Sequence, residues 1–230
     1  PTDGLAIAKL ISSYKVTIMC GTSTFFRLYT KNQKIHSLMF ESLRLVVSGA
    51  EKLREDVRIE FKKRFAKDIL EGFGTTETSP VATCNLPDVL SPDFSIQKGQ
   101  KAGTVGMAIP GTTIKIVDPV TFKELKVNEE GMILISGIQV MKSYLDDEDR
   151  TKKALKVINA KTYYITGDKG KLDEDGFLTI VDRYSRFAKI GGEMISLGAI
   201  EELISKFIES TDNLIDFLVT SLEDEKKGEK

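Results

Sequence analysis

The order of helical and strand patterns in residues 1–74 most constrains the fold of this 230-residue chain. The clearest helix lies in residues 52–67, where Leu53, Val57, Phe61 and Phe65 recur every four positions. Helical and β-branched runs alternate through this region, which predicts helices packed on a largely parallel sheet. The remaining segments are a helix in 4–15 capped by Thr2 or Asp3, a helix after Thr22 or Ser23, and strands in 16–20, 43–49 and 68–74.

After about residue 100 the sequence changes to short strands separated by Gly, Pro and Asp. A run of Asp, Glu, Asp and Gly at 173–176 is a strong hairpin-turn signal. These features predict a small barrel or a twisted antiparallel sheet. Its expected strands cover 112–118, 131–137 and 171–183; one helix is expected at 147–158, another at 197–210, and a last strand at 215–220 before a charged, solvated end.

The composition excludes several classes of function. Apolar residues make up 41% of the chain and the net charge is −1, so nothing global points to nucleic acid or an anionic membrane. No run approaches roughly 18 consecutive apolar residues, so no membrane span is expected. Cys20 and Cys84 have neither metal-ligand nor disulfide spacing, and Cys20 is expected to be buried. The single histidine, His36, argues against Ser-His-Asp and zinc chemistry.

Residues 71–80, EGFGTTETSP, combine two glycines with three threonines and two glutamates. Glycines let the backbone approach a ligand closely, and Thr75 and Thr76 offer hydroxyl and N–H groups to an anion. Glu77 could hold magnesium beside phosphate oxygens, and Phe73 could stack on a base. By themselves these residues are more typical of a surface turn. They do not form a Walker loop, because no Gly-Lys-Ser/Thr follows.

Four other stretches, in a fixed order around residues 71–80, change this interpretation. They are VVSGAEKL (46–53), GMILISGIQVMKSYL (131–145), YYITGDKG (163–170) and DRYSRFAKIGGEMISLGAIEE (182–202). Together they resemble the adenylate-forming superfamily of acyl-CoA synthetases, luciferases and peptide-synthetase adenylation domains. Residues AEKL and RFAKIGGEMISL look most like bacterial acyl-acyl carrier protein synthetases, in which this domain is commonly joined to a 2-acylglycerophosphoethanolamine acyltransferase.

The resemblance covers the chain from about Val16 onward and implies an α/β fold. Residues 1–100 would form part of the second α/β subdomain of the large adenylating domain, with a parallel sheet. Residues 101–184 would form a small distorted β-barrel subdomain. Residues 185–230 would form the hinge and the truncated start of a small α+β C-terminal domain. The chain is thus expected to be an internal fragment of a longer protein.

The resemblance also implies a role for each matched residue. Thr76 would contact the α-phosphate, Glu77 would bind magnesium, and Lys189 would act in catalysis. Ser185 would be the hinge, with Gly191, Gly192 and Glu193 in the loop presented to the thiol. The other expected nucleotide-binding residues are Gly49, Ala50 and Glu51 as a backbone wall beside adenine, Gly72, Phe73, Gly74 and Thr75 in the loop, and Asp168 and Arg183 on the ribose.

Four of these roles have a plainer alternative. The Gly49-Ala50 pair can be a strand-to-helix turn, Thr-Gly-Asp at 166–168 a hairpin turn, Arg183 a surface ion-pair residue and Lys189 a solvated lysine. Two motifs depart from the superfamily pattern. Phe73 stands where Tyr is commoner, and Glu130-Gly131-Met132 stands where Gly-Glu-Leu is usual.

The implied reaction joins ATP and a long-chain fatty acid to acyl-AMP, with Mg²⁺, and then transfers the acyl group to the phosphopantetheine thiol of acyl carrier protein. Coenzyme A is the alternative acceptor, and a non-catalytic nucleotide-binding or interaction module is the alternative class. The superfamily's upstream phosphate loop and downstream catalytic lysine have no match here, so the fragment itself is expected to be inactive. The expected location is cytoplasmic, with the parent protein at the cytoplasmic face of the inner membrane.

Overall fold

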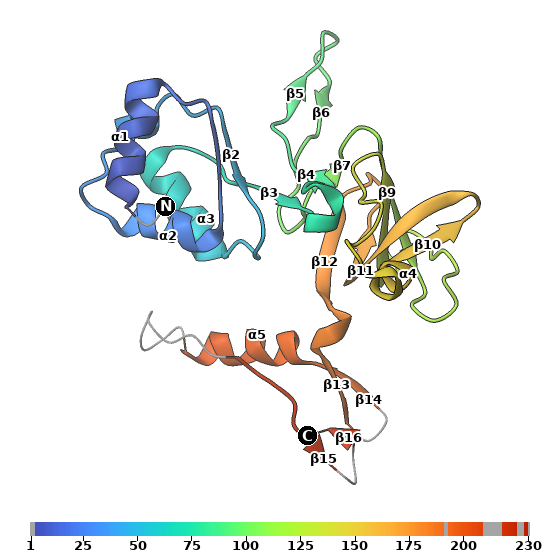
Figure 1. The fold of residues 1–230 in the computed structure, drawn as a ribbon. Helices are drawn as coiled ribbons and strands as arrows, with labels where there is room; N and C mark the ends of the chain where they lie inside the picture. The colour runs from blue at the N-terminus through green and yellow to red at the C-terminus, as the bar shows by residue number, and fades with distance from the viewer. Residues whose placement is uncertain (1–2, 191–192, 209–217, 225–227, 230) are drawn as a thin grey trace.

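The computed structural model describes residues 3–190, 193–208, 218–224 and 228–229 (Figure 1). An N-terminal layer of helices and strands lies beside a curled antiparallel sheet. A small C-terminal part lies below both of them in the view and follows the last strand of the curled sheet (Figure 1). The chain therefore has an α/β fold in which a mixed sheet is followed by a half-barrel.

The N-terminal layer follows the predicted alternation of helices and strands. Its elements are α1 (Gly4–Tyr14), β1 (Ile18–Gly21), α2 (Ser23–Lys31), β2 (Leu45–Ser48), α3 (Glu55–Phe65) and β3 (Leu70–Phe73), with 3-10 turn η1 (Ser37–Phe40) between α2 and β2. The two predicted caps are confirmed: Asp3 Oδ1 accepts from the N–H of Ala6 at 3.0 Å, and Thr22 Oγ1 accepts from Phe25 at 3.4 Å.

The sheet order is β1-β2-β3-β4-β7, with β4 at Thr83–Cys84 and β7 at Met107–Ala108. Strands β1, β2 and β3 are parallel, whereas β4 and β7 are antiparallel to their neighbours. The prediction of a largely parallel sheet is confirmed for β1 to β3. The sheet as a whole is mixed, and its last strand lies past residue 100.

An aromatic core fixes the helices to this layer. Phe26, Phe40, Phe61 and Phe65 are all buried and contact one another, with centroids 4.7 Å apart for Phe40 and Phe65. The four-residue spacing of α3 places Val57, Phe61 and Phe65 on its buried face. Packing of these rings, rather than intrinsic helix propensity, supplies most of the stability of such short helices.

The prediction that Cys20 is buried is wrong: Cys20 is exposed. In the described part of the chain β1 is the end strand of its sheet, and its residues alternate in exposure, with Met19 buried between exposed neighbours. An apolar run at a sheet edge therefore has one face covered by helices and the other open. Gly21 is the last residue of β1.

The second sheet has the order β10-β11-β9-β8, and β12 pairs with β11. Its strands are β8 (Thr112–Val117), β9 (Gly131–Gly137), β10 (Leu155–Ile158), β11 (Lys161–Leu172) and β12 (Leu178–Arg183). The antiparallel sheet and the turn at 173–176 are confirmed. The expected helix at 147–158 is too long: α4 ends at Ala154, and the apolar residues after it form β10.

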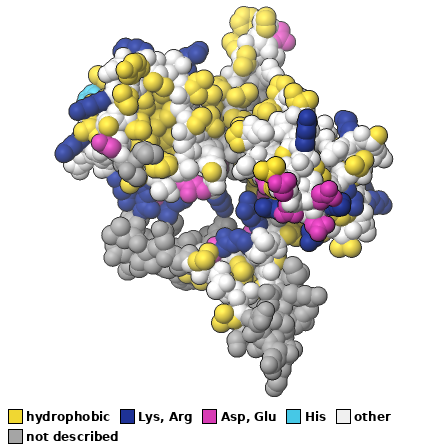
Figure 2. All heavy atoms as spheres, viewed as in Figure 1, with side chains coloured by type: hydrophobic (Ala, Val, Ile, Leu, Met, Phe, Trp, Pro, Cys, Tyr) yellow, Lys and Arg dark blue, Asp and Glu magenta, His cyan; other side chains and the backbone are white. Residues whose placement is uncertain are grey.

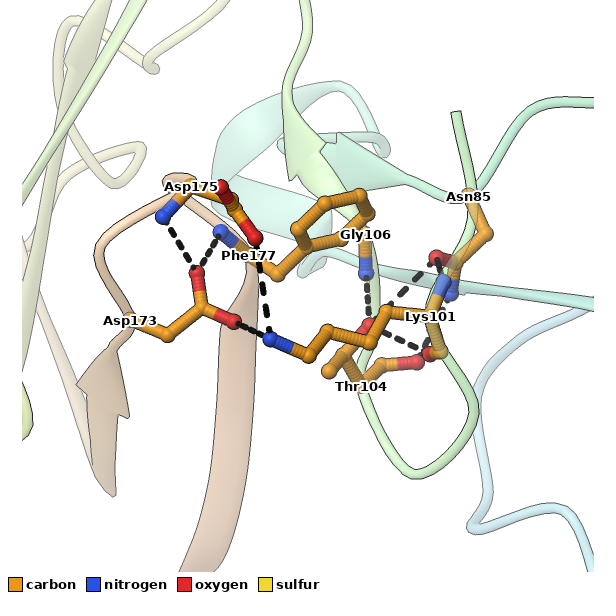
Figure 3. A network of polar contacts seen from close by, with 7 residues as sticks. All are labelled: Asn85, Lys101, Thr104, Gly106, Asp173, Asp175 and Phe177. Carbon is orange, nitrogen blue, oxygen red and sulfur yellow. Dashed lines mark hydrogen bonds and ion pairs between the residues drawn. The ribbon is translucent and has the colours of Figure 1, made fainter. Parts of the chain in front are cut away.

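A polar network joins the N-terminal layer to the second sheet (Figure 3). Buried Asn85 donates through Nδ2 to the carbonyls of Glu71 and Thr104, at 3.2 and 2.7 Å, and accepts the N–H of Lys101 at 3.0 Å. Lys101 Nζ then reaches Asp173 in the hairpin turn that follows β11. The network therefore fixes the end of β3 relative to β11 and β12.

A hairpin of β5 (Val89–Leu90) and β6 (Ile96–Gln97) projects from the first sheet (Figure 1). Its hydrophobic side chains are exposed, and Figure 2 shows them as a yellow projection at the top of the molecule. No helix among the described residues is long and apolar enough to cross a membrane.

The C-terminal part begins at η3 (Tyr184–Arg186) and continues with β13 (Phe187–Ile190), β14 (Glu193–Ser196) and α5 (Leu197–Ile208). The helix predicted from Leu197 is confirmed. The strand predicted at 215–220 is wrong where it is described, because residues 218–220 have no regular structure; 215–217 lie outside the described residues. The charged end instead contributes strands β15 (Glu223–Asp224) and β16 (Gly228–Glu229), which pair with each other.

Candidate active site

A cavity of about 930 Å³ lies between the N-terminal layer and the second sheet. One wall is the loop after β3, and the opposite wall comes from β11, β12 and η3. The lining residues are Cys20, Gly21, Thr22, Val47, Gly49, Ala50, residues 72–77, Pro80, Val81, Cys84, Tyr164, Thr166, Gly167, Arg183, Tyr184 and Ser185. The tertiary structure thus brings most of the expected nucleotide-binding residues to one cavity.

The loop after β3 is held in shape by its own side chains. Thr75 donates its N–H to Thr78 Oγ1 at 2.9 Å, and Thr78 Oγ1 donates to the carbonyl of Thr75 at 3.0 Å. A side chain at Gly74 has no space, because its Cβ would lie 1.7 Å from the carbonyl oxygen of Pro80. These constraints form the short 3-10 turn η2 (Thr76–Thr78) and leave Thr76 exposed at the cavity.

Buried Thr75 Oγ1 has no hydrogen-bond partner among the described residues. A buried hydroxyl without a partner costs free energy, so such an atom usually meets a water or a ligand. It lies beside exposed Thr76, so the strip Thr75–Glu77 has the donor groups that suit an anion.

Glu77 is fixed by a segment that sequence reasoning did not assign to the site. The hydroxyl of Tyr144 donates to Glu77 Oε1 at 2.6 Å, and the N–H of Met141 donates to the carbonyl of Glu77 at 2.8 Å. Burial raises the pKa of Glu77, but hydrogen bonding, most strongly from Tyr144, outweighs it, so the pKa lies below its ordinary value. Glu77 is therefore an ionised carboxylate at neutral pH.

Tyr164 also lines the cavity and was not predicted from the sequence. Burial and the charge of Glu77 raise the pKa of Tyr164 to about 12, so its hydroxyl keeps its proton. Both tyrosines lie in stretches that carried the family resemblance, 131–145 and 163–170, but a tyrosine in a strand is also an ordinary core residue. The stretches that carried the resemblance thus contained both tyrosines, but the sequence did not indicate that either tyrosine belongs to the site.

Asp168 and Arg183 lie on paired strands, directly opposite each other. Arg183 Nε donates to Asp168 Oδ1 at 2.7 Å; the Asp168 side chain is 2% exposed and that of Arg183 is 62% exposed. Buried Asp168 Oδ2 has no partner among the described residues. Burial raises the pKa of Asp168, and the charge of Arg183 and its hydrogen bond offset this only in part.

An irregularity in β11 sets the position of Asp168. Its pairing with β9 shifts between Ile165 and Lys169, and Gly167 has φ +76°, a backbone conformation that glycine adopts without strain. Asp168 N–H then donates to Thr166 Oγ1 at 3.0 Å. A residue with a Cβ at 167 would oppose this local bend, which explains the Thr-Gly-Asp sequence in physical terms.

The cavity floor is made by the open face of β1 to β3. Glycines 21, 49 and 72 have no side chains to fill the space, and Val47, Cys20 and Cys84 line it. Gly49 and Ala50 border the cavity with their backbone, and Ala50 has a positive φ of 68°. Glu51 is not among the lining residues: its carboxylate accepts the N–H of Thr24 at 2.5 Å, in the first turn of α2.

The residues expected in thiol transfer lie partly outside the described chain. Ser185 lines the cavity within η3, at the point where the second sheet meets the C-terminal part. Lys189 lies in β13 opposite Met194, and Glu193 is the first residue of β14. Gly191 and Gly192, which connect these strands, lie outside the described residues.

The profile of the family described as "AMP-binding enzyme" matches residues 1–145. The chain belongs to this family. It is 32% identical to a 4-coumarate–CoA ligase of Nicotiana tabacum over 99% of this chain and 40% of the relative, and 30% identical to a long-chain-fatty-acid–CoA ligase of Yersinia pestis over 91% and 35%. A 4-coumarate–CoA ligase of Glycine max is 30% identical, with 97% of this chain and 73% of the relative covered.

Solved structures of AMP-binding enzymes share the fold. ATP-bound MatB from Rhodopseudomonas palustris gives a TM-score of 0.78 at 26% identity, covering 99% of this chain and 41% of that protein. An o-succinylbenzoate CoA synthetase from Bacillus subtilis, solved with its acyl-adenylate intermediate, gives 0.75 at 26% identity, covering 99% and 42%. The chain thus spans about two fifths of these structures' length.

The donor set fits magnesium held together with a nucleotide. Among the described residues no group of three or more His, Cys, Asp or Glu side chains could hold a metal. Mg²⁺ in nucleotide sites is commonly bound by one or two carboxylates, with phosphate oxygens and waters completing the shell. Glu77, ionised and beside the unpartnered hydroxyl of Thr75, meets that requirement.

Proposed function

We propose that this chain forms one side of the active site of an ATP-dependent acid–thiol ligase. One observation carries the proposal: the strip at Thr75–Glu77 and Arg183 line the same cavity from opposite sides, and Arg183 is paired with buried Asp168, which lies just behind the lining residue Gly167. Each side has one buried polar atom without a partner, Thr75 Oγ1 and Asp168 Oδ2. A nucleotide supplies a phosphate for the first and ribose hydroxyl donors for the second.

In this proposal adenine lies against Phe73 and the backbone of Gly49 and Ala50. Asp168 accepts the ribose hydroxyls, and Arg183 holds the carboxylate of Asp168 from its exposed side. Thr76 contacts the α-phosphate, and Glu77 binds Mg²⁺. Phe73 also packs on the core of the second sheet, so its ring is fixed before any ligand arrives.

The chemistry assigned to these residues is positioning and charge stabilisation. A carboxylate oxygen of the acid attacks the α-phosphorus, a new O–P bond forms, and the bond to pyrophosphate breaks. Thr76 would donate a hydrogen bond to the negative charge that develops on the α-phosphate. Magnesium, when bound, supplies further charge neutralisation. The acyl-adenylate is then attacked by a thiol, which forms the thioester and releases AMP.

The acid would lie on the cavity floor. That floor is open because of its glycines and is lined by Val47, Val81 and thiol side chains, so it suits an apolar acyl group such as a fatty acid. Lys189 and Glu193, with the connection through Gly191 and Gly192, are assigned to the loop that meets the thiol, and Ser185 to its hinge.

Coenzyme A is the acceptor that the relatives favour, since those compared above are named as CoA ligases or synthetases in several organisms. Acyl carrier protein is the second candidate, because RFAKIGGEMISL resembles carrier-protein synthetases. Both acceptors present the same phosphopantetheine thiol. A reaction using ATP and either thiol would take place in the cytoplasm, and coupling to a phospholipid acyltransferase at the inner membrane belongs to the carrier-protein alternative.

The first test is nucleotide binding to this chain, measured by calorimetry with AMP and with ATP and Mg²⁺. We expect saturable binding that is weakened at least about tenfold by Thr76→Val, since a hydrogen bond to a charged group is lost. Tyr14→Phe, at an exposed side chain at the end of α1, is the control and should bind as the wild type does. Absence of binding to the wild type would contradict the proposal.

The second test measures thioester formation by the whole protein with a long-chain fatty acid, offering coenzyme A and acyl carrier protein separately. Product with coenzyme A alone would assign the acceptor and reject the carrier-protein alternative, and the converse result would reject coenzyme A. Nucleotide binding without any adenylate would overturn the ligase and assign a non-catalytic module. We expect the 230-residue chain alone to give no pyrophosphate exchange.

A further inference from the structure

The segment between β9 and α4 holds Glu77 at two points. Tyr144 Oη donates to Glu77 Oε1 at 2.6 Å, and Met141 N–H donates to the Glu77 carbonyl at 2.8 Å. The contact from Tyr144 fixes the carboxylate of Glu77, and the contact from Met141 fixes the backbone of η2. This segment follows a strand of the second sheet, so Glu77 is oriented by a separate part of the fold rather than by its own loop alone.

Tyr144 is itself fixed from two sides. Its N–H donates to Thr151 Oγ1 at 2.9 Å, and the guanidinium carbon of Arg150 lies 4.1 Å from its ring centroid. Both partners belong to α4. A cation over a tyrosine face holds the ring by electrostatic attraction. The phenol thus reaches Glu77 in a set position, which is the requirement for orienting a metal ligand.

We propose that Tyr144 is a positioning residue that makes Glu77 a one-oxygen ligand. With Oε1 held by the hydroxyl, Oε2 is the oxygen available to a cation, and the carboxylate cannot rotate freely to offer both. This inference rests on the proposed function of Glu77. Mg²⁺ requires near-octahedral geometry and keeps its waters, whereas Ca²⁺ accepts bidentate carboxylates in looser geometry. Tyr144 would therefore favour Mg²⁺ over Ca²⁺.

The test uses the whole protein with ATP and measures metal binding directly. Mn²⁺ bound in the presence of ATP is followed by electron paramagnetic resonance, and Mg²⁺ and Ca²⁺ are compared by their competition with Mn²⁺. In Tyr144→Phe we expect Mn²⁺ and Mg²⁺ to bind about tenfold more weakly, the effect of losing a hydrogen bond to a charged group. The affinity for Ca²⁺, measured by its competition with Mn²⁺, should change less. The ratio of Mg²⁺ affinity to Ca²⁺ affinity should therefore fall.

A double-mutant cycle with Glu77→Gln separates orientation from general damage. If Tyr144 acts through the carboxylate, Tyr144→Phe should have no further effect on the metal ratio in the Glu77→Gln background. Arg150→Gln, which removes the cation over the ring but leaves the hydroxyl, should give a smaller change in the same direction. Tyr14→Phe, at an exposed side chain at the end of α1, should bind each metal as the wild type does.

The outcomes distinguish the two proposals. A wild-type protein that binds no metal with ATP would overturn both this inference and the role of Glu77. A wild type that binds metal, with Tyr144→Phe unchanged in affinity and in Mg²⁺/Ca²⁺ ratio, would overturn only the role of Tyr144. The role of Tyr144 would also be overturned if Tyr144→Phe lowered the affinity for Mn²⁺, Mg²⁺ and Ca²⁺ equally and did so in the Glu77→Gln background as well. The effect of the substitution would then be structural.

Discussion

Asp168 combines burial with an incompletely used carboxylate. One oxygen accepts from Arg183, and the other has no partner among the described residues. Burying such a carboxylate lowers the free energy of unfolding, because its ionised form has lost its hydration. Residues held in this way are common where a ligand completes the hydrogen bonds, and the carboxylate then serves binding rather than folding.

Asp168→Asn should raise thermal stability at pH 7 while weakening nucleotide binding about tenfold or more. Burial raises the pKa of Asp168 above its unfolded value, so its favourable contribution to folding is present at low pH and is lost as pH rises through the folded pKa. The asparagine does not ionise. Unfolding temperatures of both proteins between pH 3.5 and 8 should therefore converge at the acid end and diverge at neutral pH.

Leaving Arg183 without its partner should cost little, since its side chain is mostly exposed. The quantity to compare is the unfolding temperature of Asp168→Asn minus that of the wild type. A smaller difference at pH 7 than at pH 3.5 would refute this explanation of Asp168.

The junction between the two sheets shows how elements position the site. Figure 3 shows Asn85 and Lys101 in one network, but the two residues differ in burial. Asn85 is 4% exposed and satisfies backbone groups on both sides, whereas the Lys101 side chain is 48% exposed in its ion pair with Asp173. The two contacts should therefore contribute unequally.

Asn85→Ala should lower the free energy of unfolding by about 1–3 kcal/mol, because it leaves the buried carbonyl of Thr104 unpaired. Lys101→Ala should cost less than about 1 kcal/mol, as expected for an exposed ion pair. Urea denaturation of both variants checks the order of the two effects. Equal losses would show that the exposed ion pair contributes as much as the buried amide and would contradict this ranking.

At the scale of the whole molecule, polar contacts of η3 and of the residue before α5 connect α5 to the second sheet. Glu201 pairs with Arg186 of η3 and accepts the N–H of Val219 at 2.8 Å. Ser196, just before α5, donates to Asp182 of β12 and accepts from the N–H of Ala199 at 3.0 Å. Among the described residues, these polar contacts connect the C-terminal part to β12 and η3.

Glu201→Ala should increase amide hydrogen exchange in α5 and in residues 218–222, because it removes an acceptor and an ion-pair partner together. Exchange in α3, buried in the aromatic core of the N-terminal layer, serves as the internal control and should not change. Unchanged exchange in α5 would mean that Glu201 does not hold the C-terminal part.

Sequence alone determined the elements with strong local signals. The four-residue spacing of α3, the caps Asp3 and Thr22, and the turn at 173–176 are local, so propensity and spacing were sufficient to predict them. The exposure of Cys20 and the end of α4 depend on which neighbours cover a segment. An apolar run gives no information about its partners.

For the site, the residue types of residues 71–80 and the order of the companion motifs were evident from the sequence, whereas the tertiary structure decided which side chains meet. Tyr144 lies 67 positions from Glu77 along the chain, and their contact exists because a segment that follows β9 of the second sheet packs against the loop that follows β3 of the first. Glu51, matched by motif, turns instead to the start of α2, since the helix N-terminus offers its carboxylate a free N–H. Motif spacing is a property of the chain, whereas a hydrogen bond requires closeness in space.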